Sequence, residues 1–346
     1  VMFMFRVASF TEGLFLLCGS TSNQFPQTFT PFHECTPGFP ISTDSMFMQL
    51  ARKLNASAKP VHVAFPFTTL CIATALAFGI GGASGFNLNL GAGEKEKAPY
   101  FIGVSASMMF IIGVVLSVVG LTALKPLLLF FGSTDTVLPY AMEYTKYLAL
   151  GFPFAIISSG GSHLVRADGS PKFSMACNLV GAIVNVILDY LFVMVFNWKM
   201  AGAAIATVIG QILASIMVIW YLIHFKTIKL HGKHFVPQLK IVGRTVHLGM
   251  AQCLNQLAIM FVQVVMNKSL TYYGALSPYG ADIPLACTGI VMKVNQVYFS
   301  ICIGVAQGIQ PIASFNRGAG KNDRVKKTYK LAVSCNTIIS TIAFII

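Results

Sequence analysis

Charged residues are scarce in this sequence of 346 residues: Asp, Glu, Lys and Arg make up 10% of it, while 55% is hydrophobic. A soluble domain usually carries about 25% charged residues, because its surface has to be solvated. A chain this apolar cannot cover itself with polar side chains, so the composition excludes an ordinary soluble protein. We expect an all-α polytopic membrane protein, with the lipid bilayer as its surroundings.

Motifs of several enzyme and pump classes are also missing. The eight Cys lie mostly inside apolar stretches and no pair has the spacing of metal ligands, so neither a metal site nor a disulfide framework is expected. No Gly-Lys-Ser/Thr loop is present to hold nucleotide phosphates, which argues against an ATP-driven pump. The seven His lie mostly in loops or near the ends of apolar stretches. We expect neither an enzyme nor a cofactor.

Acidic residues are fewer still, with 11 Asp and Glu against 24 Lys and Arg. A basic surplus can indicate a nucleic-acid partner. Here, however, 15 of the basic residues fall in one alternating set of loops, and only Lys125, Lys199 and Lys268 fall in the other. Cytoplasmic loops of membrane proteins are enriched in Lys and Arg. The surplus therefore predicts that the loops with the 15 basic residues are cytoplasmic, and no nucleic-acid partner is expected.

Long apolar stretches recur from residue 63 onward, each near the roughly 20 residues that a membrane helix needs. They cover residues 63–85, 100–121, 138–160, 173–196, 200–223, 244–267 and 284–313, and an eighth begins at residue 329.

These stretches suggest four regions. Residues 1–62 match no later pattern and stay unplaced. Residues 63–225 form a first group of helices, 226–243 a basic cytoplasmic linker, and 244–346 an incomplete second group. Because Val1 is not a start methionine and the last residues lie inside an apolar run, we expect a fragment of a longer reading frame.

Two loops of the sequence resemble each other. Residues 89–97 read NLGAGEKEK and residues 316–324 read NRGAGKNDR, an offset of 227 residues. Gly81 and Gly308 match at the same offset. A unit duplicated in one orientation predicts two similar bundles related by an axis along the membrane normal. By this symmetry the intact protein should have twelve helices, of which about eight are present here.

The candidate ion site lies in the fourth and fifth stretches. Asn185 and Asp189 interrupt an apolar run and, four residues apart, share one helix face. A carboxylate inside the membrane is costly and usually faces a cavity that carries ions or protons. Thr207 reaches a similar depth if the chain turns back near residues 197–200. We expect a proton site here, or a Na+ site at Asp189; the alternative is that these side chains only connect helices.

A second polar group predicts a wet substrate cavity. Gln252, Asn255 and Gln256 are spaced three and four residues apart and form one stripe on the predicted helix 244–267. The next apolar stretch holds further polar candidates for the cavity, which are Lys293, Asn295 and Gln296. The alternative is that these side chains pack against polar neighbours.

Several segments resemble the multidrug and toxic compound extrusion (MATE) family, and within it they are more similar to the bacterial efflux proteins. They are RADGSP at 166–171, NVILD at 185–189, AGAAIAT at 201–207, GIQP at 308–311 and NRGAG at 316–320. The resemblance implies a two-lobe bundle of twelve helices that exports cationic, amphipathic drugs or dyes in exchange for H+ or Na+.

The resemblance also implies a role for the candidate ion site. In the family an Asn and an Asp on the fifth helix and a Thr on the sixth form the site, and Asn185, Asp189 and Thr207 match them. The acid of the family's first helix has no matching counterpart. The expected protein is a monomeric antiporter of the cell membrane. The alternative is a lipid-linked saccharide flippase of related architecture, for which Lys293 is the main basic cavity candidate.

Overall fold

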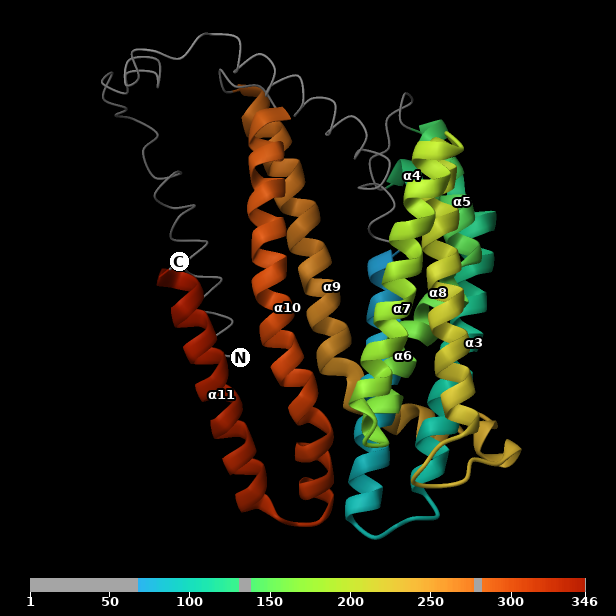
Figure 1. The fold of residues 1–346 in the computed structure, drawn as a ribbon, viewed down its shortest axis with the longest axis vertical. Coiled ribbons are helices and arrows are strands. Elements are labelled where there is room, and N and C mark those ends of the chain that lie inside the picture. Colours follow the sequence, from blue (N-terminus) through green and yellow to red (C-terminus); the bar gives the residue numbers. More distant parts are fainter. Residues whose placement is uncertain (1–67, 131–137, 277–281, 346) are drawn as a thin grey trace. The chain divides into compact units, whose positions relative to one another are not determined.

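The computed structural model describes residues 68–130, 138–276 and 282–345, so the unplaced segment 1–62 lies outside the described residues. The described elements are helices (Figure 1). In order they are Thr68–Gly91, α3 (Ala98–Thr122), α4 (Leu124–Phe130), α5 (Leu138–Leu150), α6 (Phe152–Ala167), α7 (Pro171–Asp189), the π-helix η1 (Tyr190–Val195), α8 (Lys199–Ile223), the 3-10 helix η2 (Gly232–Phe235), α9 (Leu239–Leu276), α10 (Asp282–Gly318) and α11 (Asn322–Ile345).

Six described segments are long and apolar enough to cross a bilayer, or seven if the bent pair α5–α6 counts as one span. The six are Thr68–Gly91, Ala98–Thr122, Pro171–Val193, Ala201–Ile223, Leu239–Gly274 and Tyr298–Gly318. The sequence predicted about eight. The eighth predicted stretch is α11, which is a helix but is not among the six, since charged residues fill its first turns and lower its hydropathy.

The third predicted span, residues 138–160, is wrong as one continuous helix. The chain breaks at Gly151 between α5 and α6, which are bent by 57° to one another, and α6 continues to Ala167. Pro153 is in the first turn of α6 and has no amide hydrogen to donate, so helical hydrogen bonding is interrupted at this point. A Cβ on Gly151 would lie 2.7 Å from the Val208 side chain, so the break also lets α8 approach closely.

The internal repeat is confirmed in the backbone. Each copy is a helix that ends in a turn with a glycine in the left-handed region, at φ 82° for Gly93 and φ 72° for Gly320. The hydrogen bonds correspond at the offset of 227: Gly93 N–H to Leu90 O (3.2 Å) and Glu94 N–H to Asn89 O (2.9 Å) in the first turn, and Gly320 N–H to Arg317 O (3.2 Å) and Lys321 N–H to Asn316 O (2.9 Å) in the second.

The two repeated turns pack against each other. A Cβ on Gly91 would lie 2.1 Å from the carbonyl oxygen of Phe315, and a Cβ on Gly318 would lie 2.0 Å from that of Leu88. Leu88 and Phe315 correspond in the repeat, as do Gly91 and Gly318, so the two contacts are equivalent. Only glycine, which has no Cβ, allows the two helices to approach this closely.

A packed core lies in the first group of helices, where α3, α5, α6, α7 and α8 contact one another. Many large apolar side chains point outward instead, such as Met175 (66% exposed) on α7 and Phe261 (69% exposed) on α9. A bilayer can surround such apolar side chains, which fits a sequence that is apolar on both sides of its helices.

Candidate functional site

The candidate ion site depends on close packing of α7 against α8. A Cβ on Gly210 would lie 2.7 Å from the carbonyl oxygen of Gly181, and one on Gly181 would lie 3.0 Å from that of Gly210. Small buried residues recur at every fourth position of α8, at Gly202, Ala206, Gly210 and Ala214. Such spacing is typical of closely packed membrane helices. It brings the polar side chains of the two helices within reach of one another.

Two of the three predicted ion-site residues contact each other directly. The Asn185 side-chain amide donates a hydrogen bond to the Thr207 hydroxyl (3.3 Å), and this hydroxyl donates to the Ala203 carbonyl oxygen (2.9 Å). Asp189 lies one turn farther along α7. Its Oδ1 is buried and accepts no hydrogen bond within the described part of the chain. An unsatisfied buried oxygen is costly, so Asp189 is the residue of this group that could hold a proton or a cation.

The helix changes character directly after Asp189. The sequence predicted one helix over residues 173–196, but α7 ends at Asp189 and the π-helix η1 follows. The wider turn is visible in the bond from Phe196 N–H to the Leu191 carbonyl oxygen (2.9 Å), five residues back. Such turns occur often at functional sites. Tyr144 of α5 lies within electrostatic range of Asp189, a proximity that no local sequence signal indicates.

The predicted cavity residues lie on α9 and α10. Asn255, Gln256 and Asn295 are half-buried, while Gln252 is exposed. Lys293 and Gln296 are on α10, and their side chains lie outside the described residues. α9 packs on α10 and α3, whereas the ion-site helices pack on each other and on α5 and α6. The cavity lined by α9 and α10 residues stays a prediction.

The segment RADGSP is a structural junction. The Asp168 carboxylate accepts three hydrogen bonds, from the Tyr221 hydroxyl (2.8 Å), the Lys226 amide (2.8 Å) and the Thr227 amide (2.9 Å). Gly169, at φ 76°, turns the chain from α6 into α7. One buried carboxylate therefore connects the α6–α7 turn to the end of α8 and the start of the linker.

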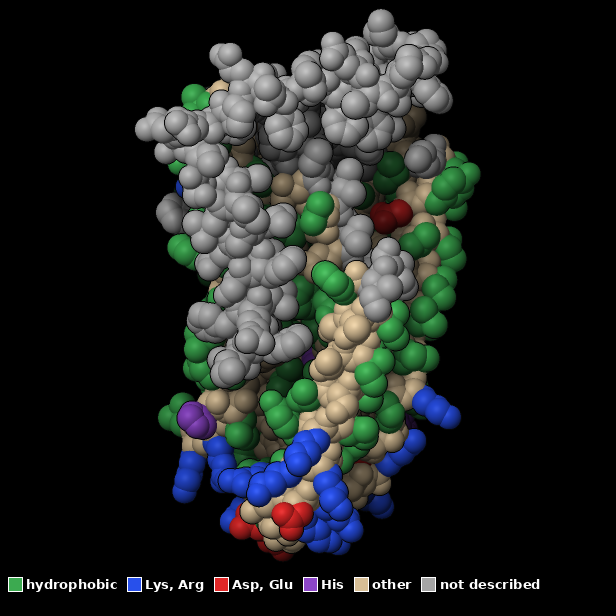
Figure 2. All heavy atoms as spheres, turned by 90° about the vertical axis from the view of Figure 1, so that its left-hand side faces the viewer, with side chains coloured by type: hydrophobic (Ala, Val, Ile, Leu, Met, Phe, Trp, Pro, Cys, Tyr) green, Lys and Arg blue, Asp and Glu red, His purple; other side chains and the backbone are tan. Residues whose placement is uncertain are grey.

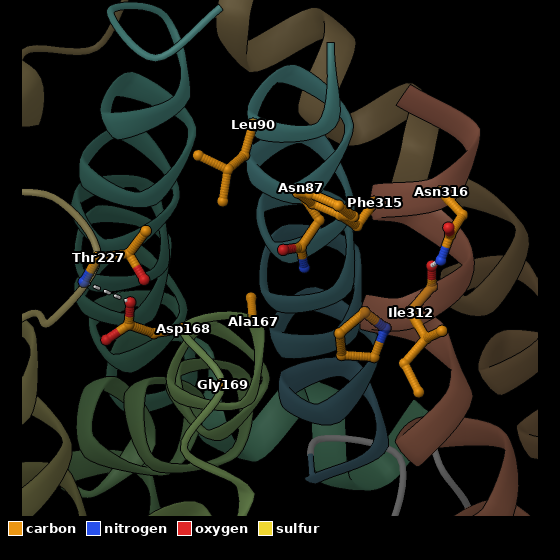
Figure 3. A pocket seen from close by; sticks show the side chains of 10 residues that line it. Asn87, Leu90, Ala167, Asp168, Gly169, Thr227, Ile312, Phe315 and Asn316 are labelled. Atoms are coloured by element: carbon orange, nitrogen blue, oxygen red, sulfur yellow. Dashed lines mark hydrogen bonds between the residues drawn. The ribbon is translucent and has the colours of Figure 1, made fainter. Parts of the chain in front are cut away.

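A pocket of about 370 Å³ opens beside this junction (Figure 3). It is lined by Asn87 and Leu90 of the first described helix, by the Asp168 turn and by Phe315 and Asn316 of α10. Asn87 is buried, and its side-chain nitrogen has no hydrogen-bond partner among the described residues. None of the predicted site residues line this pocket.

A sequence model of the MatE family matches residues 60–191 and 252–346. The chain belongs to this family. The match includes Asn185 and Asp189 on α7, together with both copies of the repeated turn. As a MatE protein it is an integral membrane protein of a transporter family, as its helices already indicated.

Curated relatives support the assignment to MatE. The chain is 24% identical over 287 residues to the multidrug export protein MepA of Staphylococcus saprophyticus, covering 83% of this chain and 62% of that protein. It is 23% identical to MepA of Staphylococcus aureus, and the match covers 82% of this chain and 62% of that protein. The chain thus spans less than two thirds of the length of these relatives.

Solved structures agree with the family fold. The MATE multidrug transporter DinF-BH in complex with R6G is 27% identical with a TM-score of 0.75, covering 87% of this chain and 66% of that one. A crystal structure of MATE in complex with MaD3S is 22% identical with a TM-score of 0.75, and the match covers 83% of this chain and 64% of that one. Because its sequence identity is only 22%, the similarity to the MaD3S complex is evidence for the fold alone.

Proposed function

We propose that this protein is a secondary-active multidrug exporter, which moves cationic, amphipathic compounds across the cell membrane in exchange for H+ or Na+. The observation that carries the proposal is the arrangement of three oxygen-bearing side chains on α7 and α8. Asn185 is bonded to Thr207, and the buried Asp189 Oδ1 has no partner among the described residues. Family membership supports transport, and the multidrug names of the relatives support the substrate class.

The proposed chemistry needs only the exchange of one positive charge at Asp189. A proton on the carboxylate supplies a hydrogen-bond donor and removes the negative charge. A Na+ ion instead takes oxygen ligands from Asp189, the Asn185 amide and the Thr207 hydroxyl. Either event changes the charge between α7 and α8, and so can favour one of two conformations of the bundle. No cofactor beyond the coupling ion enters the proposal, and the protein acts as a monomer.

The second candidate function is a lipid-linked saccharide flippase of related architecture. A pyrophosphate-bearing substrate calls for a basic cavity. Among the predicted cavity residues only Lys293 is basic, whereas the others are neutral amides. A neutral, polar cavity beside a carboxylate suits a cationic compound better, so export of cations remains the proposed function.

The test is efflux of a cationic dye from vesicles that contain the complete protein. Imposed pH and Na+ gradients are compared for the unaltered protein and for Asp189→Asn. The proposal expects efflux under one gradient, which names the coupling ion, and loss of that efflux in Asp189→Asn. Thr207→Ser serves as the matched control, because serine keeps both hydrogen bonds of the hydroxyl, whereas Thr207→Val removes them and should impair efflux.

Two outcomes would contradict the proposal in different ways. Efflux that is unchanged in Asp189→Asn would make this residue structural and place the coupling site elsewhere. No dye efflux under either gradient, together with transfer of a lipid-linked saccharide in the same vesicles, would favour the flippase.

A further inference from the structure

A dense group of exposed basic side chains surrounds the turn between α10 and α11. We call it the α11 basic face, and it consists of Arg317, Lys321, Arg324, Lys326, Lys327 and Lys330. All six side chains are exposed, and Asp323 is the one acidic residue among them. None forms an ion pair in the described part of the chain, where the recorded pair is Lys97–Glu94. Figure 2 shows Lys and Arg side chains gathered at one end of the described helices.

The internal repeat shows that this charge is not required by the turn itself. The first turn has the same backbone hydrogen bonds and the same left-handed glycine. Yet its residues 94–97 read EKEK, which is neutral overall, and Lys97 is paired with Glu94 at 3.1 Å. At the offset of 227, Lys326, Lys327 and Lys330 correspond to uncharged residues. The basic face is therefore a property of the second copy alone.

The equivalent face of the first copy is covered by polypeptide. There, Gly103 of α3 packs so closely on η2 that a Cβ would lie 2.3 Å from the His234 carbonyl oxygen. The Tyr100 ring meets the His234 ring edge-on at 4.7 Å. Lys327 and Lys330 of α11 stand at the positions of Tyr100 and Gly103 in the repeat. The face that packs on polypeptide in one copy thus carries cationic side chains in the other.

The surroundings of the lysines match the boundary between a membrane and water. Tyr329 and Leu331 are 68% and 67% exposed, next to Lys330 on the same helix. Tyrosine, with its apolar ring and polar hydroxyl, favours the headgroup level of a bilayer. Farther along α11 the exposed side chains become apolar, as at Val333 and Phe344. A soluble acidic protein would not explain these exposed apolar neighbours.

We propose that the α11 basic face binds the phosphate headgroups of anionic phospholipids in the leaflet on its side of the membrane. By the distribution of Lys and Arg this is the cytoplasmic leaflet. Juxtamembrane clusters of four to eight basic residues attract anionic lipids, and exposed charges with no acidic partner keep their full attraction. The long lysine side chains extend from the helix to the headgroups while their methylene groups lie along apolar surface.

Native mass spectrometry of the purified complete protein tests this proposal, and it requires no transport activity. The delipidated protein is titrated with phosphatidylglycerol or with phosphatidylcholine of the same acyl chains. The proposal expects phosphatidylglycerol to bind more tightly by at least about tenfold, with the preference falling when ammonium acetate is raised from about 0.1 M to about 1 M. The triple variant K326Q/K327Q/K330Q should lose the preference.

The first turn supplies the matched control. The variant K95Q/K97Q removes lysines from the equivalent turn and should keep the full preference for phosphatidylglycerol. A triple variant on α11 that retains the preference would overturn the proposal. So would displacement of phosphatidylglycerol by inorganic phosphate at equal concentration, because the site would then recognise the free anion and not the lipid. Equal binding of both lipids by the unaltered protein would overturn it as well.

Discussion

Asp168 is a single side chain on which three segments of the chain depend. Its carboxylate accepts hydrogen bonds from the Tyr221 hydroxyl and from two backbone amides, of Lys226 and Thr227. Hydrogen bonds to an ionised acceptor are stronger than neutral ones, and their loss leaves buried donors without a partner. The residue therefore matters for stability at a place where the sequence shows only a loop.

We expect Asp168→Asn to lower the free energy of unfolding by about 3 kcal/mol, because the new amide group presents hydrogens to donors that need an acceptor. Thermal unfolding in detergent measures this through thiol labelling of the buried Cys71 and Cys177. Asp323→Asn is the control, since Asp323 is exposed on α11 and should leave the melting temperature unchanged. Equal melting temperatures for Asp168→Asn and the unaltered protein would show that the three bonds add nothing.

At the scale of elements, the spacing between α7 and α8 determines the candidate site. The glycines at 181 and 210 let the two backbones approach, and this approach permits the bond from Asn185 to Thr207. A side chain at either glycine forces the helices apart, because the nearest atom is a backbone carbonyl oxygen that cannot rotate away.

Gly210→Val should therefore destabilise the protein by about 1–3 kcal/mol and weaken ion-coupled efflux, as overpacking does in a well-packed contact. Thermal unfolding and dye efflux measure the two effects. Gly304→Ala on α10 is the control, because nothing lies within 4 Å of a Cβ there. A stable Gly210→Val protein with normal efflux would argue against close helix approach as a requirement for the site.

The 3-10 helix η2 contains a hydrogen bond that depends on pH. Burial lowers the pKa of His234 below its usual 6.5, with Lys233 and His231 acting in the same direction. The neutral ring accepts a hydrogen bond at Nδ1 from the His231 amide (3.0 Å), which a protonated ring cannot do. Below about pH 6.5 the unfolded chain binds a proton at His234 that the folded chain does not. The contribution of the neutral ring to stability is therefore full above about pH 6.5, and it falls as the pH drops toward the lower pKa of the folded state.

We expect the melting temperature to fall between about pH 7.5 and about pH 5.5, and His234→Gln to reduce that fall. Thermal unfolding across this range provides the measurement. His247→Gln, at an exposed position of α9, should keep the full pH dependence. If His234→Gln and the unaltered protein show the same slope, the dependence arises from another group.

At the scale of the whole molecule, the two repeated turns hold the two groups of helices together at one end. The contacts Gly91–Phe315 and Gly318–Leu88 are equivalent, and Gln310 adds hydrogen bonds to the Ile80 carbonyl oxygen (3.2 Å) and the Ser84 hydroxyl (2.9 Å). Arg166 also bonds across to Gln307. An exporter has to break such contacts when it opens to this side.

We expect Gly318→Ala to separate the two turns and to lower stability by about 1–3 kcal/mol. Spin labels at Lys95 and Lys321, which are exposed positions in the two turns, should report a longer distance. Adding Gly91→Ala should give less than additive destabilisation, because one separation relieves both contacts. Gly308→Ala, with no atom within 4 Å of its Cβ, should leave the distance unchanged, and an unchanged distance in Gly318→Ala would contradict the predicted separation.

Much of the fold could be predicted from composition and pattern. The scarcity of charge indicates helices in a membrane, and the NxGAG repeat indicates a duplicated unit whose turns share their hydrogen bonds. The four-residue spacing of Asn185 and Asp189 places both on one face of α7. The turn in each copy of the repeat and the spacing of Asn185 and Asp189 are local features, because each depends on residues close in sequence.

Tertiary structure decided the rest. The close approach of α8 at Gly151 and the three donors to Asp168 each depend on atoms far away in the sequence. No local pattern specifies that Gly210 meets Gly181, or that α3 is covered by η2. Composition and spacing were enough to predict which segments are apolar and mostly helical. Which helix faces meet depends on how closely two backbones can approach each other. The spacing of residues along the sequence carries no information on that distance, so only the packed structure shows it.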